Sequence, residues 1–263
     1  MTATSQRQVP EHTGSTGTRM LGAVTLAGVL VFLLLALVIS PPEVDQGEAV
    51  RLLYLHVPAA VLTYVAFFTT AFASAMWLWK RSTGWDLLAV ASAEIGVIFC
   101  GLTLVIGMLW GEPIWGTWWT WDARLTTTAL LFLLYVGYLV VRRLPIEADR
   151  RRRYAAWVGL LAVVDIPIVH YSVEWWRGLH QGRTLDPIDT KIDDLMLFTL
   201  LFGFVVFALV FVWLLGHRFR LAWLEDRVER RLDDDLLDER RAEARAPDVA
   251  DAVTTVTSTG AST

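Results

Sequence analysis

The sequence predicts an all-α protein, a membrane bundle of six transmembrane helices, and three observations lead to this prediction. The 263-residue chain is 55% hydrophobic and only 19% charged. Its mean hydropathy is +0.47, and its apolar residues form long uninterrupted blocks. Only helices and closed barrels can satisfy their backbone polar groups inside a bilayer, and a helix needs about 20 apolar residues to cross it. Continuous blocks exclude a barrel, because barrel strands alternate.

Six blocks are long enough, near residues 20–40, 58–79, 87–110, 125–141, 155–172 and 194–216. The first follows a polar stretch over residues 2–18, so we interpret it as a retained span and not as a cleaved signal peptide. The predicted organisation is a disordered cytoplasmic N-terminus (1–19), a membrane domain (20–216) with an outer loop at 111–124, and a charged cytoplasmic tail (217–263).

The basic residues of the short loops predict the orientation, because they favour the cytoplasmic side. They cluster between spans two and three, between spans four and five, and after span six: Lys80, Arg81, Arg142, Arg143, Arg150, Arg151, Arg152, Arg153, Arg218 and Arg220. Both termini are therefore expected in the cytoplasm, because the number of spans is even. Segments 41–57, 111–124 and 173–193 are expected outside.

The tail at 221–246 mixes charges of both signs with leucines at roughly helical spacing. This pattern predicts a helix at the membrane surface or against a partner, and a merely solvated helix fits equally well. Within the spans, Cys100 is expected to be buried, and as the only cysteine it cannot form an internal disulfide. Glu94 and Asp165 are expected to face the bundle interior with partners, as parts of a proton path or as structural hydrogen-bonding groups.

Five histidines are the main candidates for metal chemistry. His12 lies in the polar N-terminus, and a helix end or lipid contact explains His217. His56 precedes Pro58, which suits the first turn of span two. His180 lies in the loop between spans five and six, and His170 lies near the outer end of span five. His56 and His180 are therefore expected on the outer face.

Tryptophans concentrate on the same face. Of 13 in the chain, seven lie in two outer segments: Trp110, Trp115, Trp118, Trp119, Trp121, Trp175 and Trp176. An aromatic belt would be more scattered, so the concentration favours a platform. If residues 115–121 were helical, Trp115, Trp118 and Trp119 would share a face, and if they were extended, Trp115, Trp119 and Trp121 would.

Paired histidines beside an indole platform fit haem, whose iron accepts imidazole and whose porphyrin packs against aromatic rings. Zinc fits less well, because it needs three or four clustered ligands. Outer arginines suit the haem propionates, and a lipid headgroup contact is the simpler alternative for each. These arginines are Arg51, Arg124, Arg177 and Arg183. Asp122 is expected to orient Arg124 or the loop backbone.

The stretch "WGEPIWGTWWTWDARLT" (111–127) resembles the tryptophan-rich WWD signature of haem-handling proteins of cytochrome c biogenesis, the CcmC, CcmF and CcsA superfamily. The segments "YLHVPAA" and "IPIVHYSVEWWRGLHQG" resemble the histidine-bearing segments of its CcmC family. The resemblance covers most of residues 20–216. Two departures are "WDARLT" where larger relatives continue WDP, and Asp165 where an asparagine is expected.

The resemblance implies that His56 and His180 are the axial ligands of haem b, which is carried and not chemically converted. It assigns the platform to Trp115, Trp118, Trp119, Trp121 and Asp122, followed by Arg124, and Trp175 and Trp176 are natural additions. It also implies delivery to the haem chaperone CcmE beside the transporter subunits CcmA and CcmB and the small protein CcmD. No nucleic-acid partner is expected. No family role transfers to His170.

Two other classes remain open. A cytochrome b subunit for quinone chemistry also uses paired histidines, but on facing helices within the membrane, where only His170 is a candidate. A non-catalytic assembly subunit of a transporter satisfies the hydropathy pattern but leaves the histidines and tryptophans unexplained. Haem copurification separates the haem-binding classes from the assembly class, and redox turnover with quinol distinguishes a cytochrome b.

Overall fold

The computed structural model describes residues 15–176 and 193–245, which are mostly helical and contain no strand of a sheet. The elements are α1 (Thr16–Leu34) with a π-helical last turn η1 (Leu35–Ile39), α2 (Val50–Lys80), α3 (Thr83–Trp115), α4 (Ala123–Val141), α5 (Ala148–Ala162), α6 (Asp165–Trp175) and α7 (Asp194–Arg245). Six helical segments of the described chain are long and apolar enough to cross a membrane, with α5 and α6 together forming one of them. The predicted fold class is confirmed.

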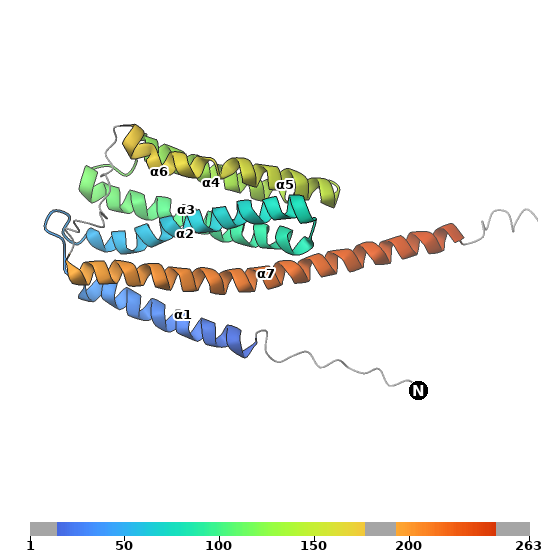
Figure 1. The fold of residues 1–263 in the computed structure, drawn as a ribbon, viewed down its shortest axis with the longest axis horizontal. Coiled ribbons are helices and arrows are strands. Elements are labelled where there is room, and N and C mark those ends of the chain that lie inside the picture. Colours follow the sequence, from blue (N-terminus) through green and yellow to red (C-terminus); the bar gives the residue numbers. More distant parts are fainter. Residues whose placement is uncertain (1–14, 177–192, 246–263) are drawn as a thin grey trace, which may run out of the picture. The chain divides into compact units, whose positions relative to one another are not determined.

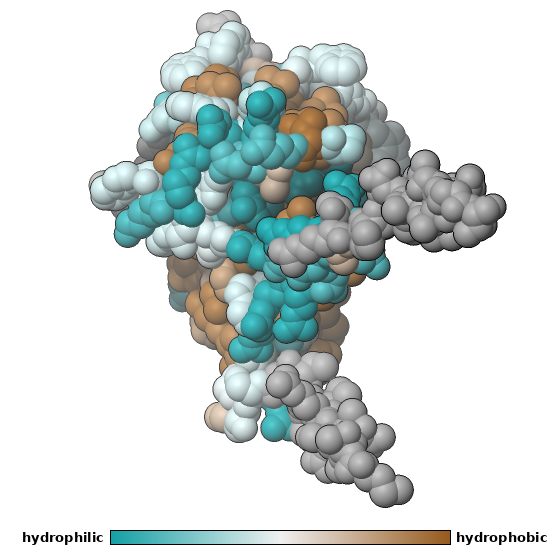
Figure 2. All heavy atoms as spheres, turned by 90° about the vertical axis from the view of Figure 1, so that its right-hand side faces the viewer, coloured by the Kyte–Doolittle hydropathy of each residue, from teal (hydrophilic) through white to brown (hydrophobic). Residues whose placement is uncertain are grey.

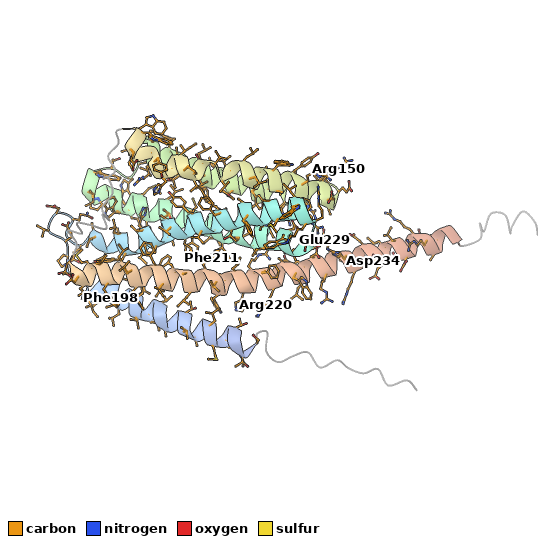
Figure 3. All side chains as sticks on the ribbon, in the orientation of Figure 1. Arg150, Phe198, Phe211, Arg220, Glu229 and Asp234 are labelled. Carbon is orange, nitrogen blue, oxygen red and sulfur yellow. The ribbon has the colours of Figure 1, made fainter. Side chains whose placement is uncertain are left out.

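Residues up to Phe219 form one compact unit, and the chain from Arg220 onward forms a second. In the first unit, α2 and α3 lie between α1 and α7 on one side and α4, α5 and α6 on the other (Figure 1). The connections lie at two ends. The tryptophan end contains residues 40–49, 116–122 and the last turn of α6. The arginine end contains residues 80–83 and 142–148. Phe198 and Arg150 mark these opposite ends in Figure 3.

Aromatic packing joins the central helices. The rings of Phe67 on α2 and Tyr135 on α4 stack with centroids 3.6 Å apart and planes 3° from parallel. The Tyr135 hydroxyl donates to the carbonyl oxygens of Phe67 at 3.2 Å and of Gly159 at 3.3 Å. One buried tyrosine thus fastens three helices. Its hydroxyl is satisfied by backbone, as a buried polar group requires.

The second span begins earlier than its sequence predicted. Residues 50–57 are helical, and Pro58 is buried inside α2 and not in its first turn. Val50 and Tyr54, one helical turn apart, are both buried in a cluster with Met196 and Leu200 of α7. This packing stabilises helical turns before the proline, so the prediction that Pro58 lies in the first turn of span two is wrong, and His56 lies within α2.

The fifth span, predicted as one helix, is broken at residues 163–164. Pro167 has no backbone N–H for the carbonyl of Val163, and a proline ring clashes with the carbonyl four residues before it. The Val164 N–H instead donates to the Leu161 oxygen, three residues back, at 3.2 Å. The helix restarts as α6, with Asp165 as its first residue.

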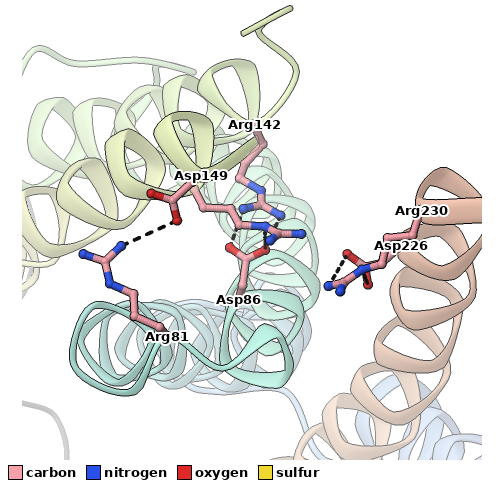
Figure 4. Close-up of polar contacts among 7 residues, drawn as sticks. Arg81, Asp86, Arg142, Asp149, Asp226 and Arg230 are labelled. Atoms are coloured by element: carbon pink, nitrogen blue, oxygen red, sulfur yellow. Dashed lines mark hydrogen bonds and ion pairs between the residues drawn. The ribbon is translucent and has the colours of Figure 1, made fainter. Parts of the chain in front are cut away.

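The arginine end holds a buried ion cluster (Figure 4). Arg142 donates two hydrogen bonds to the Asp86 carboxylate, at 2.5 and 2.9 Å, and Arg152 approaches the same carboxylate at 3.1 Å. Burial acts to lower the pKa of Arg142, but the charge of Asp86, its hydrogen bond with Arg142 and the neighbouring Tyr138 and Glu94 together outweigh burial, so that this pKa is raised. Arg142 therefore stays charged. Viewed from this end, hydrophilic side chains gather on the face (Figure 2).

In the second unit, α7 continues as a helix to Arg245, which confirms the helix predicted for the tail. Arg230 pairs with Asp226 at 2.9 Å, and the guanidinium of Arg227 lies 4.2 Å from the centroid of the Trp223 ring. One stripe of apolar side chains along this helix is exposed: Leu221, Leu224, Val228, Leu232 and Leu236. Its partner or surface stays a prediction. At the other end of the chain, α1 already starts at Thr16, within the segment predicted to be disordered.

Candidate functional site at the tryptophan end

The tryptophan loop, residues 116–122, is held at both ends by helix caps. Gly116 adopts a positive φ of 72° and donates its N–H to the Glu112 oxygen at 2.8 Å, which ends α3. The Asp122 carboxylate accepts the Leu125 N–H at 2.8 Å and starts α4. Asp122 thus caps the first turn of α4, and its two expected roles, orientation of Arg124 or of the loop backbone, stay predictions.

The loop is not helical, and α3 instead extends to Trp115, beyond its predicted end. Trp119 and Trp121, two of the three indoles that the extended alternative placed on one face, pack edge to face with centroids 5.5 Å apart. Trp115 packs against Trp110 at 5.1 Å. Trp118 is 56% exposed and Trp121 is 82% exposed. Four indoles in and before the loop thus form two pairs, and the exposed rings of Trp118 and Trp121 remain available for a ligand.

A second aromatic group lies at the end of α6. Tyr171 stacks on Trp175 with centroids 5.7 Å apart, and Trp175 meets Trp176 edge to face at 5.8 Å. Both tryptophans are more than half exposed. Arg124, at the start of α4, makes a long contact of 3.5 Å to the His170 carbonyl oxygen, which connects this group to the tryptophan loop.

His56 lies in the second turn of α2, facing α3. A Cβ atom on Gly107 would lie 3.0 Å from the His56 Cε1 atom, so the imidazole occupies space that any larger residue would fill. Four residues further along α3, the Trp115 ring lies over Gly111 in the same way, 3.1 Å from such a Cβ position. Residues four apart share a helix face. The imidazole and the indole therefore occupy successive slots on one face of α3.

Two of the predicted arginines are already engaged. Arg51 donates to the Glu48 carboxylate and to the Leu37 carbonyl oxygen at the end of the first span. Arg124 is half-buried beside α6. The other two, Arg177 and Arg183, lie outside the described residues, as does His180. Whether His180 lies near His56 therefore stays a prediction.

The described part of the loop contains two buried polar atoms without a hydrogen-bond partner, the Trp119 Nε1 and the Thr120 Oγ1. An unpaired buried donor is costly, so such atoms are uncommon in folded proteins. The neighbouring Thr117 hydroxyl, in contrast, donates to the Trp119 carbonyl oxygen at 3.1 Å. Two unused polar groups beside the exposed indoles provide hydrogen-bonding capacity at this end.

The two acidic residues within the spans, Glu94 and Asp165, differ in whether a partner is found for them. Glu94 accepts hydrogen bonds from the Nε and Nη2 atoms of Arg218, and so has the partner that was expected. Asp165 is buried as expected, but its Oδ2 has no hydrogen-bond partner among the described residues, so the predicted partner is not found there. Cys100 is fully buried and its thiol contacts the Thr128 carbonyl oxygen at 3.9 Å, which confirms its prediction.

These residues fit a flat ligand with a metal centre better than a bare metal ion. Among residues 15–176 and 193–245, no three His, Cys, Asp or Glu side chains gather as a metal site. A haem iron needs only one or two imidazoles, and its porphyrin needs aromatic surface. The described end supplies the imidazoles of His56 and His170 and exposed indoles on two segments, so its donor set fits haem.

Sequence reasoning overlooked Gly107 and Tyr171. For Gly107 the available signal was its spacing of one helical turn from Gly111 in the predicted third span. Tyr171 stands four residues before Trp175, and that spacing places two aromatic rings on one helix face.

The fold and this end define a polytopic helical membrane protein that presents exposed indoles beside a histidine-bearing helix. The profile of the CcmC family, described as heme exporter protein C, matches residues 3–233. The chain belongs to this family.

Similar curated proteins are consistent with this assignment. Heme exporter protein C of Haemophilus influenzae is 34% identical over 208 residues, 79% of this chain and 85% of that protein. The Escherichia coli K12 protein of the same name is 40% identical over 175 residues, 64% and 69% of the two chains. A putative cytochrome c biosynthesis ccmC-like mitochondrial protein of Marchantia polymorpha is 36% identical over 177 residues, 67% and 74% of the two.

Proposed function

We propose that this protein handles haem in cytochrome c biogenesis: it binds haem at the tryptophan end, with His56 and His180 as axial ligands, and delivers it to the chaperone CcmE. Family membership supports the haem-handling role. The observation that carries the proposal is the His56 imidazole against Gly107, on the α3 face that also carries Trp115. The ligand is carried and not converted, so the role is transport and not catalysis.

Each group at this end has a task. Haem supplies an iron that accepts imidazole nitrogen. His56 is anchored on a packed helix, so we assign it the role of the fixed ligand. The exposed rings of Trp118 and Trp121, with Trp175 and Trp176 on α6, offer apolar surface to the porphyrin. Arg51 and Arg124 stabilise the surrounding structure through their contacts with Glu48, Leu37 and His170. We assign the haem propionates to Arg177 and Arg183.

The cellular setting follows from the same family. We propose a bacterial inner-membrane location with the tryptophan end outside, and an assembly with CcmA, CcmB and CcmD. The arginine end would then be cytoplasmic, in keeping with the basic loops. The cytochrome b alternative has less support, because His170 is exposed on α6 and does not point into the bundle.

The decisive experiment is absorption spectroscopy of the purified protein, oxidised and reduced, with haem content measured for the parent, His56→Ala and His180→Ala. We expect low-spin haem in the parent. Each variant should either lose its haem or bind it in an altered form that added imidazole restores to low spin. His170→Ala is the matched control at the same end and should keep its haem. Haem that is indifferent to both ligand substitutions would reject the axial assignment.

Delivery needs a separate measurement. Purified CcmE should acquire covalently bound haem from the loaded parent and not from the haem-depleted variants. A parent that keeps its haem in the presence of CcmE would leave the binding site intact but contradict the delivery step.

A further inference from the structure

A groove opens at the arginine end, away from the candidate haem site, between the first turns of α3 and the membrane part of α7. Residues 82–88 and 212–219 line it, and its volume is about 490 Å³. This size lies within the range of about 300–1,000 Å³ typical of small-molecule sites. Its walls are almost wholly apolar, with Trp85 and Leu88 on α3 and Val212 and Phe219 on α7.

Missing side chains keep the groove open. Gly216 on α7 and Gly84 on α3 stand on opposite walls. A Cβ atom on Gly216 would meet nothing within 4 Å, and one on Gly84 would meet only the Ser82 Oγ, at 3.9 Å. Glycine costs about 1 kcal/mol relative to alanine inside a helix, so Gly216 costs stability without relieving any steric conflict. A ligand that occupies the space beside Gly216 would explain why a glycine stands at this position.

The length of the groove argues against a transmembrane helix as that occupant. Each wall spans seven or eight residues, which is about 12 Å along a helix, whereas the hydrocarbon core is about 30 Å thick. A spanning helix would contact a longer face. An acyl chain that enters from the headgroup level needs only a short apolar groove near the end of the bundle.

Charge at the mouth selects the headgroup. Lys80 and Arg81 immediately precede the first lining residue, Ser82, and both are exposed. Arg81 makes a long ion pair, 3.7 Å from Asp149, and its guanidinium lies 4.7 Å from the centroid of the Trp77 ring, but its side chain is still 47% exposed. Trp79 is 78% exposed beside Lys80, as interfacial tryptophans are. Cations above an apolar groove complement a negatively charged phosphate with an attached acyl chain.

We propose that this groove binds an anionic phospholipid of the surrounding bilayer, with one acyl chain between α3 and α7 and its phosphate beside Lys80 and Arg81. Such a lipid would hold α3 and α7 together, and the ion pair between Glu94 and Arg218 joins the same two helices. The site stands independently of haem binding, because its residues lie at the other end of the bundle.

The test uses the full chain in phosphatidylcholine nanodiscs that contain increasing fractions of dibrominated phosphatidylglycerol, a quencher of tryptophan fluorescence. Subtraction of the Trp85→Phe spectrum isolates the Trp85 signal. We expect Trp85 quenching to saturate at a lower fraction of brominated phosphatidylglycerol than of brominated phosphatidylcholine. One basic residue near a membrane surface contributes about 1 kcal/mol, so the preference should be about fivefold or more, and Lys80→Gln should reduce it about fivefold.

Gly216→Leu should abolish the saturable quenching, because leucine fills the groove while favouring the helix. Gly137→Leu is the matched control, since a Cβ there also meets nothing within 4 Å but lies on α4. Equal, unsaturable quenching by both lipids would overturn the proposal. Saturable Trp85 quenching that persists in Gly216→Leu would overturn it as well. Absence of Trp85 quenching, with cross-linking of Gly216→Cys to another polypeptide, would overturn it in favour of a protein partner.

Discussion

The two ends of the bundle treat their polar and aromatic groups in opposite ways. At the arginine end, Asp86 is buried with Arg142 and Arg152 around it, so these three charges are paired. At the tryptophan end, large indoles are exposed, and two buried polar atoms of the described loop have no partner. Satisfied groups stabilise a fold, whereas unused surface and unused donors serve a ligand. The comparison agrees with a stabilising ion cluster at the arginine end and with the proposed haem site at the tryptophan end.

Removal of Asp86 should give the largest effect and should touch stability alone. Asp86→Ala leaves the half-buried Arg142 and Arg152 without their shared buried carboxylate, and breaking a buried ion pair typically costs about 3–5 kcal/mol. We expect a strongly lowered midpoint of thermal unfolding in detergent, measured by circular dichroism.

Asp149→Ala is the matched control for that change. Its carboxylate is half-exposed and pairs with Arg81 at 3.7 Å, so its loss should cost no more than about 1 kcal/mol. Equal destabilisation by the two substitutions would contradict the view that burial, and not charge count, decides the strength of this end.

Gly107→Val should give the largest effect at the other end. Its side chain would enter the space of the His56 ring, and overpacking of this kind costs about 1–3 kcal/mol. We expect haem content to fall about tenfold or more while the helical signal is retained. Gly137→Val, in open space on α4, should keep normal haem content, and equal loss in both variants would count against the proposed slot.

Asp122→Ala should have an intermediate effect, because it removes the N-cap of α4. Loss of such a cap costs about 1 kcal/mol. Asp122→Asn keeps the capping oxygen and should behave like the parent in thermal unfolding. If Asn failed as fully as Ala, the negative charge and not the cap would be the function of this residue.

Trp121→Ala should have the smallest effect on stability, within about 0.5 kcal/mol, because the ring is 82% exposed. Its loss should weaken haem binding by about 0.5–1.5 kcal/mol, the usual contribution of one aromatic contact. Haem titration and thermal unfolding of the same sample separate these two effects. A change confined to unfolding would show that Trp121 belongs to the frame and not to the binding surface.

Sequence by itself determined the number of spans, the burial of Cys100 and the places where tryptophan concentrates. These features depend on local composition and on the thickness of a bilayer, so neighbouring residues are enough to reveal them. The extended alternative for the tryptophan loop also followed locally, because Gly116 and Asp122 are strong helix boundaries.

Tertiary structure alone decided what depends on contacts between distant segments. His56 is helical because Val50 and Tyr54 pack against α7, about 150 residues further along the chain. Distance in sequence also hides the pair of Glu94 and Arg218, 124 residues apart, and the Gly107 slot behind His56. A sequence pattern shows which side chains are able to act, but only packing decides which of them meet, because each contact depends on where another helix lies.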